Sequence, residues 1–341
     1  MSTKTCLMFG GGGMAGGWLN HWATHFSDRI KVIGLVDVNE EILDQQAEKL
    51  GLEKNQLFTS TEDALNSVQA DFAGVATPPQ FHALQTIAAL EAGMAVICEK
   101  PIAGTIEDAR AMVEAANRTG LPVSIIQNYR YAPDKQEARR IVDEGRFGRL
   151  QHVVGRYACD YRKMNSWGPT WRHDMDFALL FEGSIHHMDM LRFLSAGDCE
   201  TLTGFGWNPE WSSFKHLSSG MYVLKMNNGS HCFYEGNSSS AGIINGWHNE
   251  YYRLELEQAS VEIAGGKTIT VHRKDEEVEQ YEAPELKWEG HCHLFDEFLQ
   301  WLDGGEPSDT RIQENIKSFA MILAAMEAGT EGAVRQIADY L

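Results

Sequence analysis

Several features that would restrict the function of this chain are scarce or missing. No apolar run approaches the roughly 20 residues that a helix needs to cross a membrane. The six cysteines occur without CxxC spacing, so they indicate neither a disulfide framework nor a zinc site. Lys and Arg number 29 against 48 Asp and Glu, and the net charge of -19 repels phosphate backbones. We therefore expect no membrane span, no metal and no nucleic-acid partner.

The composition is that of a globular protein. Apolar residues make up 43% and charged residues 23% of the 341 residues, a length for which two domains are the natural expectation. The start, residues 1–4, leads straight into a predicted strand and not into a signal peptide, so we expect a cytoplasmic protein.

A glycine-rich turn separates the first predicted strand, residues 5–9, from a helix that begins at Trp18. A dinucleotide-binding turn needs one glycine for the tight turn, one for the approach of the pyrophosphate, and a third small residue for packing. The sequence offers this spacing in two registers, Gly10, Gly12 and Ala15 or Gly11, Gly13 and Gly16. We prefer the first because Gly10 directly follows the strand. The residues expected to contact a dinucleotide are Gly10, Gly12, Gly13 and Met14.

A second apolar strand, residues 31–36, ends in Asp37, about 20 residues beyond the glycine turn. At this place a carboxylate accepts hydrogen bonds from the adenosine ribose hydroxyls. Val38 and Asn39 follow, and neither is an Arg that could receive a 2′-phosphate, so the pattern favours NAD over NADP. The alternative is that Asp37 caps the helix that begins at Glu40.

Another apolar strand, residues 94–98, ends abruptly in Glu99, Lys100 and Pro101. Charges cannot continue a strand that is buried on both faces, so Glu99 and Lys100 belong at its carboxyl end, which faces the ligand crevice in open α/β sheets. Pro101 keeps Lys100 out of the helical region, and the ammonium is presented from a stiff turn. The alternative is a surface ion pair.

Strands and helices alternate over residues 1–125, which predicts a doubly wound parallel sheet. The strand of residues 71–76 also ends in polar and rigid groups, Thr77 and Pro78, with His82 one turn into the next helix. Together with the glycine turn, Asp37 and Lys100, these groups predict that four strand ends converge on one crevice.

The second half changes character after residue 150. Longer strands follow one another through short turns, and we expect them at residues 151–161, 201–207, 220–226, 229–234, 251–256, 260–264 and 268–272. This order indicates a mostly antiparallel open sheet within an α+β domain. We expect a domain boundary between residues 125 and 126, with the last helices, 293–302 and 312–328, able to pack back on the first domain.

Residues 182–194 predict a helix that carries an acid and two histidines. A spacing of four places Glu182 and His186 on one face, and Asp189 lies three residues beyond His186. A carboxylate beside a histidine orients the ring and raises its basicity, which suits a general base. We interpret the adjacent His187 as a core or interface residue, and the same reading is the alternative for His186.

A loop before this helix contains Trp171 and Arg172, which could supply an aromatic wall and hydrogen-bond donors for a sugar ring, or belong to a subunit interface. Near the end of the chain, His291 and His293 flank Cys292. Their spacing is poor for one metal ion on a strand or a helix, so we expect no metal there.

The motifs of the first half together resemble the Gfo/Idh/MocA oxidoreductases, named for glucose-fructose oxidoreductase, inositol dehydrogenase and a rhizopine-catabolism protein. They are the glycine turn, the acid Asp37, Ala76-Thr77-Pro78-Pro79 with His82, and Glu99-Lys100-Pro101. The resemblance implies that Lys100 lies near both the nicotinamide and the substrate, and that the turn of residues 99–101 lines the nicotinamide ribose.

The resemblance extends into the second half. The segment of residues 127–133, which includes Asn128, is similar to the one with which the family leaves its nucleotide domain. The family pattern of an acid four residues before a His, with Asp three residues later, fits His186, although Glu182 stands where many relatives carry Asp. Relatives tend to pair their open sheets, which implies a homodimer or homotetramer.

These expectations combine in an NAD-dependent dehydrogenase that oxidises a secondary alcohol of a sugar, cyclitol or related polyol. His186, held by Glu182, would take the hydroxyl proton, while Lys100 stabilises the developing charge on the oxygen. Two alternatives stay open. One is a glycosidase or lyase that uses NAD for transient oxidation, and the other is a non-catalytic sugar or NAD sensor.

Overall fold

The computed structural model describes residues 2–242 and 244–341, and the chain divides into two compact units. Unit 1 comprises Met1–Asn128 and Gly290–Ile316, and unit 2 comprises Tyr129–Glu289 and Lys317–Leu341. Each unit is therefore built from two separate stretches of the chain.

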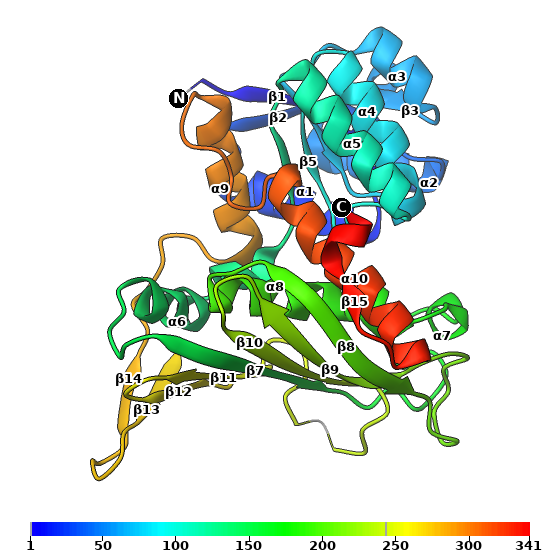
Figure 1. Ribbon diagram of the computed structural model, residues 1–341. Coiled ribbons are helices and arrows are strands. Elements are labelled where there is room, and N and C mark those ends of the chain that lie inside the picture. The colour runs from blue at the N-terminus through cyan, green and yellow to red at the C-terminus, as the bar shows by residue number, and fades with distance from the viewer. Residues whose placement is uncertain (1, 243) are drawn as a thin grey trace. The chain divides into compact units, whose positions relative to one another are not determined.

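Unit 1 contains six parallel strands in the order β3-β2-β1-β4-β5-β6 (Figure 1). Their bounds are β1 (Lys4–Phe9), β2 (Ile30–Val36), β3 (Leu57–Phe58), β4 (Phe72–Val75), β5 (Ala95–Cys98) and β6 (Val123–Ile125). The chain reverses its direction across the sheet between β1 and β4, and dinucleotides bind beside such a switch point. Every residue of β4 and β5 is buried, which explains their uninterrupted apolar sequences.

The helices of unit 1 are α1 (Gly13–His25), α2 (Glu40–Leu50), α3 (Thr61–Ser67), α4 (His82–Glu91), α5 (Ile106–Thr119) and α9 (Gly290–Leu302). Side-chain caps define several of their starts. Thr105 accepts a hydrogen bond from the Asp108 N–H at 3.1 Å before α5. Asn39 accepts one from the Glu41 N–H at 2.9 Å before α2, so Asn39 and not Asp37 caps this helix.

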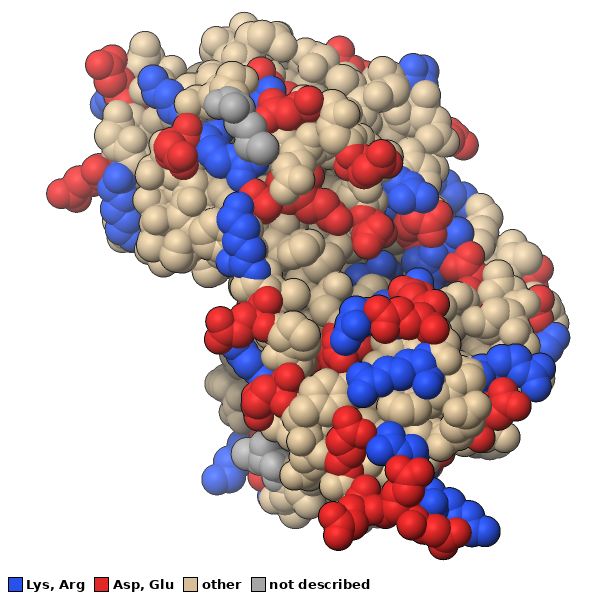
Figure 2. Space-filling model, turned by 90° about the vertical axis from the view of Figure 1, so that its left-hand side faces the viewer, with Lys and Arg blue, Asp and Glu red and all other residues tan. Residues whose placement is uncertain are grey.

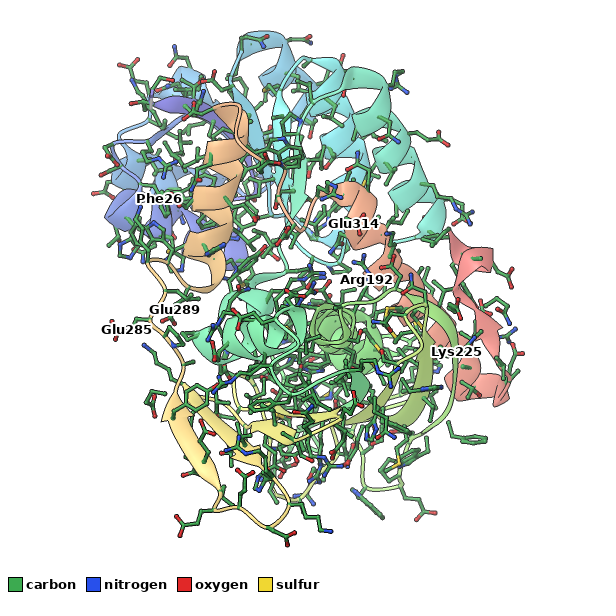
Figure 3. The ribbon with its side chains drawn as sticks, turned by 60° about the vertical axis from the view of Figure 1, so that its left-hand side comes forward. Phe26, Arg192, Lys225, Glu285, Glu289 and Glu314 are labelled. Carbon is green, nitrogen blue, oxygen red and sulfur yellow. The ribbon has the colours of Figure 1, made fainter. Side chains whose placement is uncertain are left out.

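Helix α9 packs against α1 within unit 1. The ring of Phe295 lies 5.4 Å from that of Trp18, 5.5 Å from that of Trp22 and 6.0 Å from that of Phe26, each edge to face. Figure 3 shows Phe26 at the end of α1, beside α9. This aromatic cluster joins the beginning of the chain to a helix that follows some 270 residues later.

Unit 2 contains a nine-stranded sheet in the order β14-β13-β12-β11-β7-β10-β9-β8-β15. The bounds are β7 (Leu150–Ala158), β8 (Cys199–Trp207), β9 (Ser219–Met226), β10 (His231–Asn237), β11 (Tyr251–Leu256), β12 (Ser260–Ile263), β13 (Thr268–His272), β14 (Glu279–Glu282) and β15 (Arg335–Gln336). The pairs in the described sheet are antiparallel except β7 with β10, which is parallel. The predicted mostly antiparallel sheet is thus confirmed.

Among the described residues, four α-helices belong wholly or in part to unit 2: α6 (Pro133–Asp143), α7 (Trp171–Asp174), α8 (Ile185–Ser195) and α10 (Ile312–Glu331). All residues of α8 are buried, including its histidines, acid and arginine. A π-helical turn, Leu179–Ser184, precedes α8. The predicted single α-helix over residues 182–194 is therefore wrong in its first turn, because Glu182 lies in the wider π-helical geometry.

Other differences concern strand ends and edges. The predicted strand of residues 151–161 ends at Ala158, and the sequence analysis did not expect β3, β14 or β15. These three strands are short, and the edge strand β14 is Glu279-Gln280-Tyr281-Glu282, a sequence without an apolar alternation.

On the face shown in Figure 2, Lys and Arg side chains are interspersed with Asp and Glu. Among the residues that the structure describes, no helix has the length and apolar character needed to cross a membrane.

Candidate active site

The turn between β1 and α1 begins at a glycine that no other residue could replace without strain. Gly10 has φ of +94°, and a Cβ on it would lie 2.7 Å from the carbonyl oxygen of Ala76 and 3.5 Å from the Cβ of Ala15. Gly12 is the N-cap of α1, so the unpaired N–H groups of this helix begin at the turn. Close contact at Gly10 and packing at Ala15 are what the first glycine register requires.

The carboxylate of Asp37 is fixed beside this turn. Its Oδ2 accepts a hydrogen bond from the Gly11 N–H at 2.8 Å, and its Oδ1 accepts one from the Asn39 N–H at 2.9 Å. Each carboxylate oxygen has more than one lone pair, so both can also accept a hydrogen bond from a hydroxyl. The position and orientation fit a group that receives a ribose diol.

The ends of β4 and β5 are tied together by His82, which is fully buried. Its Nε2 lies 2.8 Å from the Thr77 carbonyl oxygen and its Nδ1 lies 3.0 Å from the Pro101 carbonyl oxygen. Burial lowers the pKa of His82, and the contacts with the two carbonyl groups oppose this shift. The ring therefore positions two turns, and a direct contact of His82, Thr77 or Pro78 with a cofactor stays a prediction.

Glu99 is a buried acid, with 5% of its surface exposed, so the alternative of a surface ion pair is wrong. Its Oε1 accepts a hydrogen bond from Trp18 Nε1 at 2.9 Å, and its Oε2 accepts one from the Lys100 N–H at 3.0 Å. His291 Nε2 lies 3.8 Å from Oε1. Burial raises the pKa of Glu99, but the hydrogen bond and charge of His291, together with Lys100, lower it overall. An ionised Glu99 thus fixes the backbone from which Lys100 projects.

Gln127 was not singled out from the sequence. It follows β6, is 1% exposed, and neither its amide oxygen nor its amide nitrogen has a hydrogen-bond partner among the described residues. A buried amide of this kind is costly unless another group satisfies it. The signal in the sequence is a polar residue directly after an apolar strand, as at Glu99. The next residue, Asn128, has its Nδ2 3.5 Å from His291 Nδ1.

These observations in unit 1 fit a dinucleotide. Gly10 leaves no room for a Cβ, the start of α1 offers unpaired N–H groups, Asp37 offers carboxylate oxygens, and Gln127 offers an unsatisfied amide.

In unit 2, His186 is nearly buried, with 6% exposed. Its ring stacks on that of Tyr129, with the centroids 4.2 Å apart and the planes 13° apart. The stack fixes the plane of the imidazole by contact with a neighbouring ring, a role that the sequence analysis did not assign to Tyr129. Tyr129 is the first residue of unit 2 and lies 57 positions before His186 in the chain.

The structure brings Glu182, Arg172 and Trp171 together. Arg172 Nη2 lies 3.4 Å from Glu182 Oε2, and the guanidinium lies 5.2 Å from the ring centre of Trp171 and 5.6 Å from that of Trp167. Arg172 is therefore held between an acid and two aromatic rings. The predicted contact of Glu182 with His186 stays a prediction, and Arg172 is a charged neighbour of Glu182 that spacing along a helix could not reveal.

His187 is a buried core residue, as the sequence analysis interpreted it. Its Nδ1 lies 2.6 Å from the Tyr234 hydroxyl, which is also 2.7 Å from Ser184 Oγ, and its Nε2 lies 3.7 Å from Glu250 Oε1. Burial raises the pKa of Glu250, but the hydrogen bond and charge of His187 lower it overall.

Asp189 serves the core of unit 2. Arg130 donates to both carboxylate oxygens, from Nε and Nη2, at 2.6 Å each, and Ser318 Oγ donates to Oδ1 at 2.7 Å. The Arg130–Asp189 pair is buried and joins α8 to the segment before α6. The hydrogen bond from Ser318 joins α8 to α10.

A Rossmann sheet with this glycine turn, followed in the same chain by a mixed open sheet, defines a two-unit dinucleotide-binding oxidoreductase. The comparisons with known proteins make this specific: the chain belongs to the Gfo/Idh/MocA oxidoreductase family. Residues 4–127 match the family model of an oxidoreductase family with an NAD-binding Rossmann fold, and residues 136–265 match the GFO/IDH/MocA C-terminal domain. The resemblance seen in the motifs is confirmed, and the chain is a member of a family of NAD-binding enzymes.

Individual relatives cover nearly the whole chain. An uncharacterized protein, y4oX, of Sinorhizobium fredii is 32% identical over 96% of this chain and 95% of its own length. The D-apiose dehydrogenase of Paraburkholderia graminis is 25% identical over 89% of this chain and 82% of its own. An inositol dehydrogenase homolog from Azotobacter vinelandii, solved with NADH and myo-inositol, has the same fold, with a TM-score of 0.84, 16% identity and 98% of each chain covered.

Proposed function

We propose that this protein is an NAD-preferring dehydrogenase of a secondary alcohol on a sugar, cyclitol or related polyol. The observation that carries the proposal is the buried Glu99 carboxylate, which accepts a hydrogen bond from the Lys100 N–H at 3.0 Å. Because Glu99 is buried, it does not serve as half of a surface ion pair. Its hydrogen bond fixes the backbone at the carboxyl end of β5, and a catalytic lysine at this place needs such a fixed backbone.

The substrate class is supported by relatives. D-apiose dehydrogenase takes its name from a sugar, and the inositol dehydrogenase homolog was solved with a cyclitol. Trp171 and Arg172 offer an aromatic face and a guanidinium, and both groups suit a polyhydroxylated ring.

The preference for NAD rests on Asp37. Its two oxygens are held by the Gly11 and Asn39 N–H groups, and a fixed carboxylate accepts hydrogen bonds from ribose hydroxyls but repels a 2′-phosphate. Gly10, Gly12, Gly13 and Met14 would lie along the pyrophosphate, and Thr77, Pro78, His82, Glu99, Lys100 and Asn128 belong to the remaining cofactor contacts that we propose.

The chain's own residues would divide the chemistry between them. Bound NAD would supply the hydride acceptor. His186 would take the proton of the substrate hydroxyl, with its ring plane held by Tyr129 and its basicity supported by Glu182. Lys100 would donate a hydrogen bond to the same oxygen and stabilise its developing negative charge.

A substrate panel tests this proposal. Purified protein is offered inositols, aldoses, uronic acids and anhydrosugars, with NAD and NADP in separate assays, and the nicotinamide absorbance is followed. We expect substrate-dependent NADH formation, with NAD preferred. Cleavage of a glycoside without accumulation of NADH would indicate the glycosidase or lyase alternative. Binding of sugar and NAD without turnover of any substrate would indicate the sensor.

We further propose a homodimer or homotetramer that forms through the outer face of the unit 2 sheet. Large apolar side chains are exposed on three adjacent strands: Phe205, Trp207, Met221, Val223 and Phe233. Phe205, which is 67% exposed, is paired across β8 and β9 with Met221. Light scattering is expected to give a multiple of the chain mass, and Phe205→Lys is expected to reduce it. A monomeric native protein at micromolar concentration would contradict this proposal.

A further inference from the structure

Two helices of unit 1 bring together three side chains that commonly bind metals. His21 and His25 belong to the last turns of α1, and Cys292 belongs to the first turn of α9. One ligand atom from each residue lies within 4.8 Å of those of the other two. None of the three residues has a part in the proposed dehydrogenase reaction, so that reaction does not explain the cluster.

The spacing of the three ligand atoms is compatible with a tetrahedral metal site. His21 and His25 are four residues apart on one helix, so their rings share a face, with centroids 6.2 Å apart. Cys292 Sγ lies 3.5 Å from His21 Nδ1. Bond lengths of about 2.3 Å to sulfur and about 2.0 Å to nitrogen separate two tetrahedral ligand atoms by about 3.5 Å. The third donor atom, from His25, lies within 4.8 Å of the other two.

The two helices are held together independently of any ion. Phe295, one turn beyond Cys292, packs against Trp18, Trp22 and Phe26 of α1, and Arg29 forms an ion pair with Asp296. The backbones that carry the ligands are therefore fixed before binding, which lowers the conformational cost of forming the site.

The chemical character of the ligands selects the ion. Two imidazoles and one thiolate suit a borderline divalent ion of the first transition row and disfavour Mg²⁺ and Ca²⁺, which prefer oxygen. Cys292 is buried and His25 is exposed, so the thiol lies on the inner side of the site and the fourth position faces solvent. This arrangement of three protein ligands and water is a usual one for zinc.

We propose that His21, His25 and Cys292 bind one Zn²⁺ ion, with water as the fourth ligand, and that the ion ties α9 to α1. On binding, the Cys292 thiol releases its proton to the buffer and its sulfur forms the metal bond. Cys292 adjoins His291, which lies 3.8 Å from the Glu99 carboxylate. The ion would therefore stabilise the turn of α9 that supports Glu99. Sequence spacing could not predict the site, since Cys292 and His21 are 271 residues apart.

Cobalt substitution tests the site on the full chain, without any assay of dehydrogenase activity. Protein freed of metal with a chelator is titrated with Co²⁺, and we expect a thiolate-to-cobalt charge-transfer band with visible bands of tetrahedral strength at one ion per chain. Zn²⁺ should displace the cobalt and raise the melting temperature. Cys292→Ser should abolish the charge-transfer band, and His25→Gln should weaken binding at least about tenfold.

Matched controls separate this site from other thiols and imidazoles. Cys199→Ser changes a buried cysteine of unit 2, and His231→Gln changes an exposed histidine of β10; both should bind cobalt as the native protein does. His25 is exposed, so His25→Gln leaves the core intact and decides the question if Cys292→Ser does not fold. Absence of the charge-transfer band in the native protein, or an unchanged affinity in His25→Gln, would overturn the proposal.

Discussion

The two sheets of this protein differ in what covers them. In the unit 1 sheet, β4 and β5 are buried at every residue, so their sequences are short apolar runs that stop where the strand stops. In the unit 2 sheet, β9 alternates between buried and exposed residues over most of its length, because only one face packs within the unit. A polar group at the end of a unit 1 strand is thus conspicuous, whereas polar groups are ordinary along a unit 2 strand.

This difference carries over to the candidate site residues. Asp37, Glu99 and Gln127 each lie just beyond a strand whose last residues are buried, at the carboxyl edge of the sheet. Asp37 and Glu99 accept hydrogen bonds from backbone N–H groups there. In unit 2 the candidate groups come from a buried helix and its neighbours, where acids, histidines and tyrosines form mixed networks. The candidate residues of unit 1 can therefore be recognised by their place after a strand. Those of unit 2 can be recognised only from the residues that they contact.

The largest effect is expected from removing one proposed reacting group in each unit. His186→Ala should lower turnover by about 10² to 10⁴-fold, the usual contribution of a positioned proton transfer, with NAD affinity little changed. Lys100→Met should be at least as damaging. Steady-state kinetics and NAD titration measure both quantities.

Lys31→Met and Lys274→Met, which replace one exposed lysine in each unit, are the controls and should keep native turnover. Full turnover in His186→Ala would mean that His186 does not take the substrate proton, and would contradict the roles that we propose for His186 and Lys100.

The second prediction concerns the networks of unit 2. Asp189→Ala leaves Arg130 buried without its carboxylate, and breaking a buried pair in this way typically costs about 3 to 5 kcal/mol of unfolding free energy. Glu200→Ala removes an exposed partner of Lys225 and should cost at most about 1 kcal/mol. Urea unfolding compares the two variants, and equal losses would mean that the buried pair does not stabilise the unit.

The third prediction concerns the strand end in unit 1. Asp37→Ala should weaken NAD binding by about 1.5 to 3 kcal/mol, the usual loss for a hydrogen bond to a charged group, and should narrow the preference over NADP. Asp44→Ala, an exposed acid on α2, is the matched control and should bind NAD as the native protein does. A preference for NAD that survives in Asp37→Ala would show that another residue selects the cofactor.

The smallest effect is a dependence of stability on pH. Burial raises the pKa of Glu250, but His187 lowers it overall, so the folded pKa lies below the ordinary value of 4.5. The folded state then binds fewer protons than the unfolded state, and the contribution is present above the ordinary pKa and lost as the pH falls through the folded pKa. Glu250→Gln should therefore flatten the loss of stability below about pH 4.5. A steeper loss in this variant than in the native protein would contradict this assignment.

The same difference between the two sheets explains which features could be predicted from the sequence. The strand Ala95–Cys98 was predicted with its observed bounds except for Met94. The short turns predicted after residues 226 and 264 do join neighbouring antiparallel strands, β9 with β10 and β12 with β13. These features depend on local patterns of burial and on turn residues. The resemblance carried by the strand-end motifs then identified the family, which the family models confirm.

The remainder depends on contacts between distant residues. The π-helical turn places Glu182 outside the α-helical spacing, and its contact with Arg172 comes from packing of the preceding loop. The stack of Tyr129 on His186 and the approach of Cys292 to His21 likewise join residues that no periodicity relates. Periodicity predicts which face of an element is buried, but not which residue it will meet.

Isotopic labelling tests most directly whether hydride passes from a carbinol carbon of the substrate to NAD, as we propose. A sugar or cyclitol that the panel identifies is supplied with deuterium on its carbinol carbons, and the NADH formed is analysed by mass spectrometry. We expect NADH that carries one deuterium from the substrate, formed at a rate that falls in His186→Ala. Deuterium lost to solvent, with no labelled NADH accumulating while the substrate is cleaved, would contradict it.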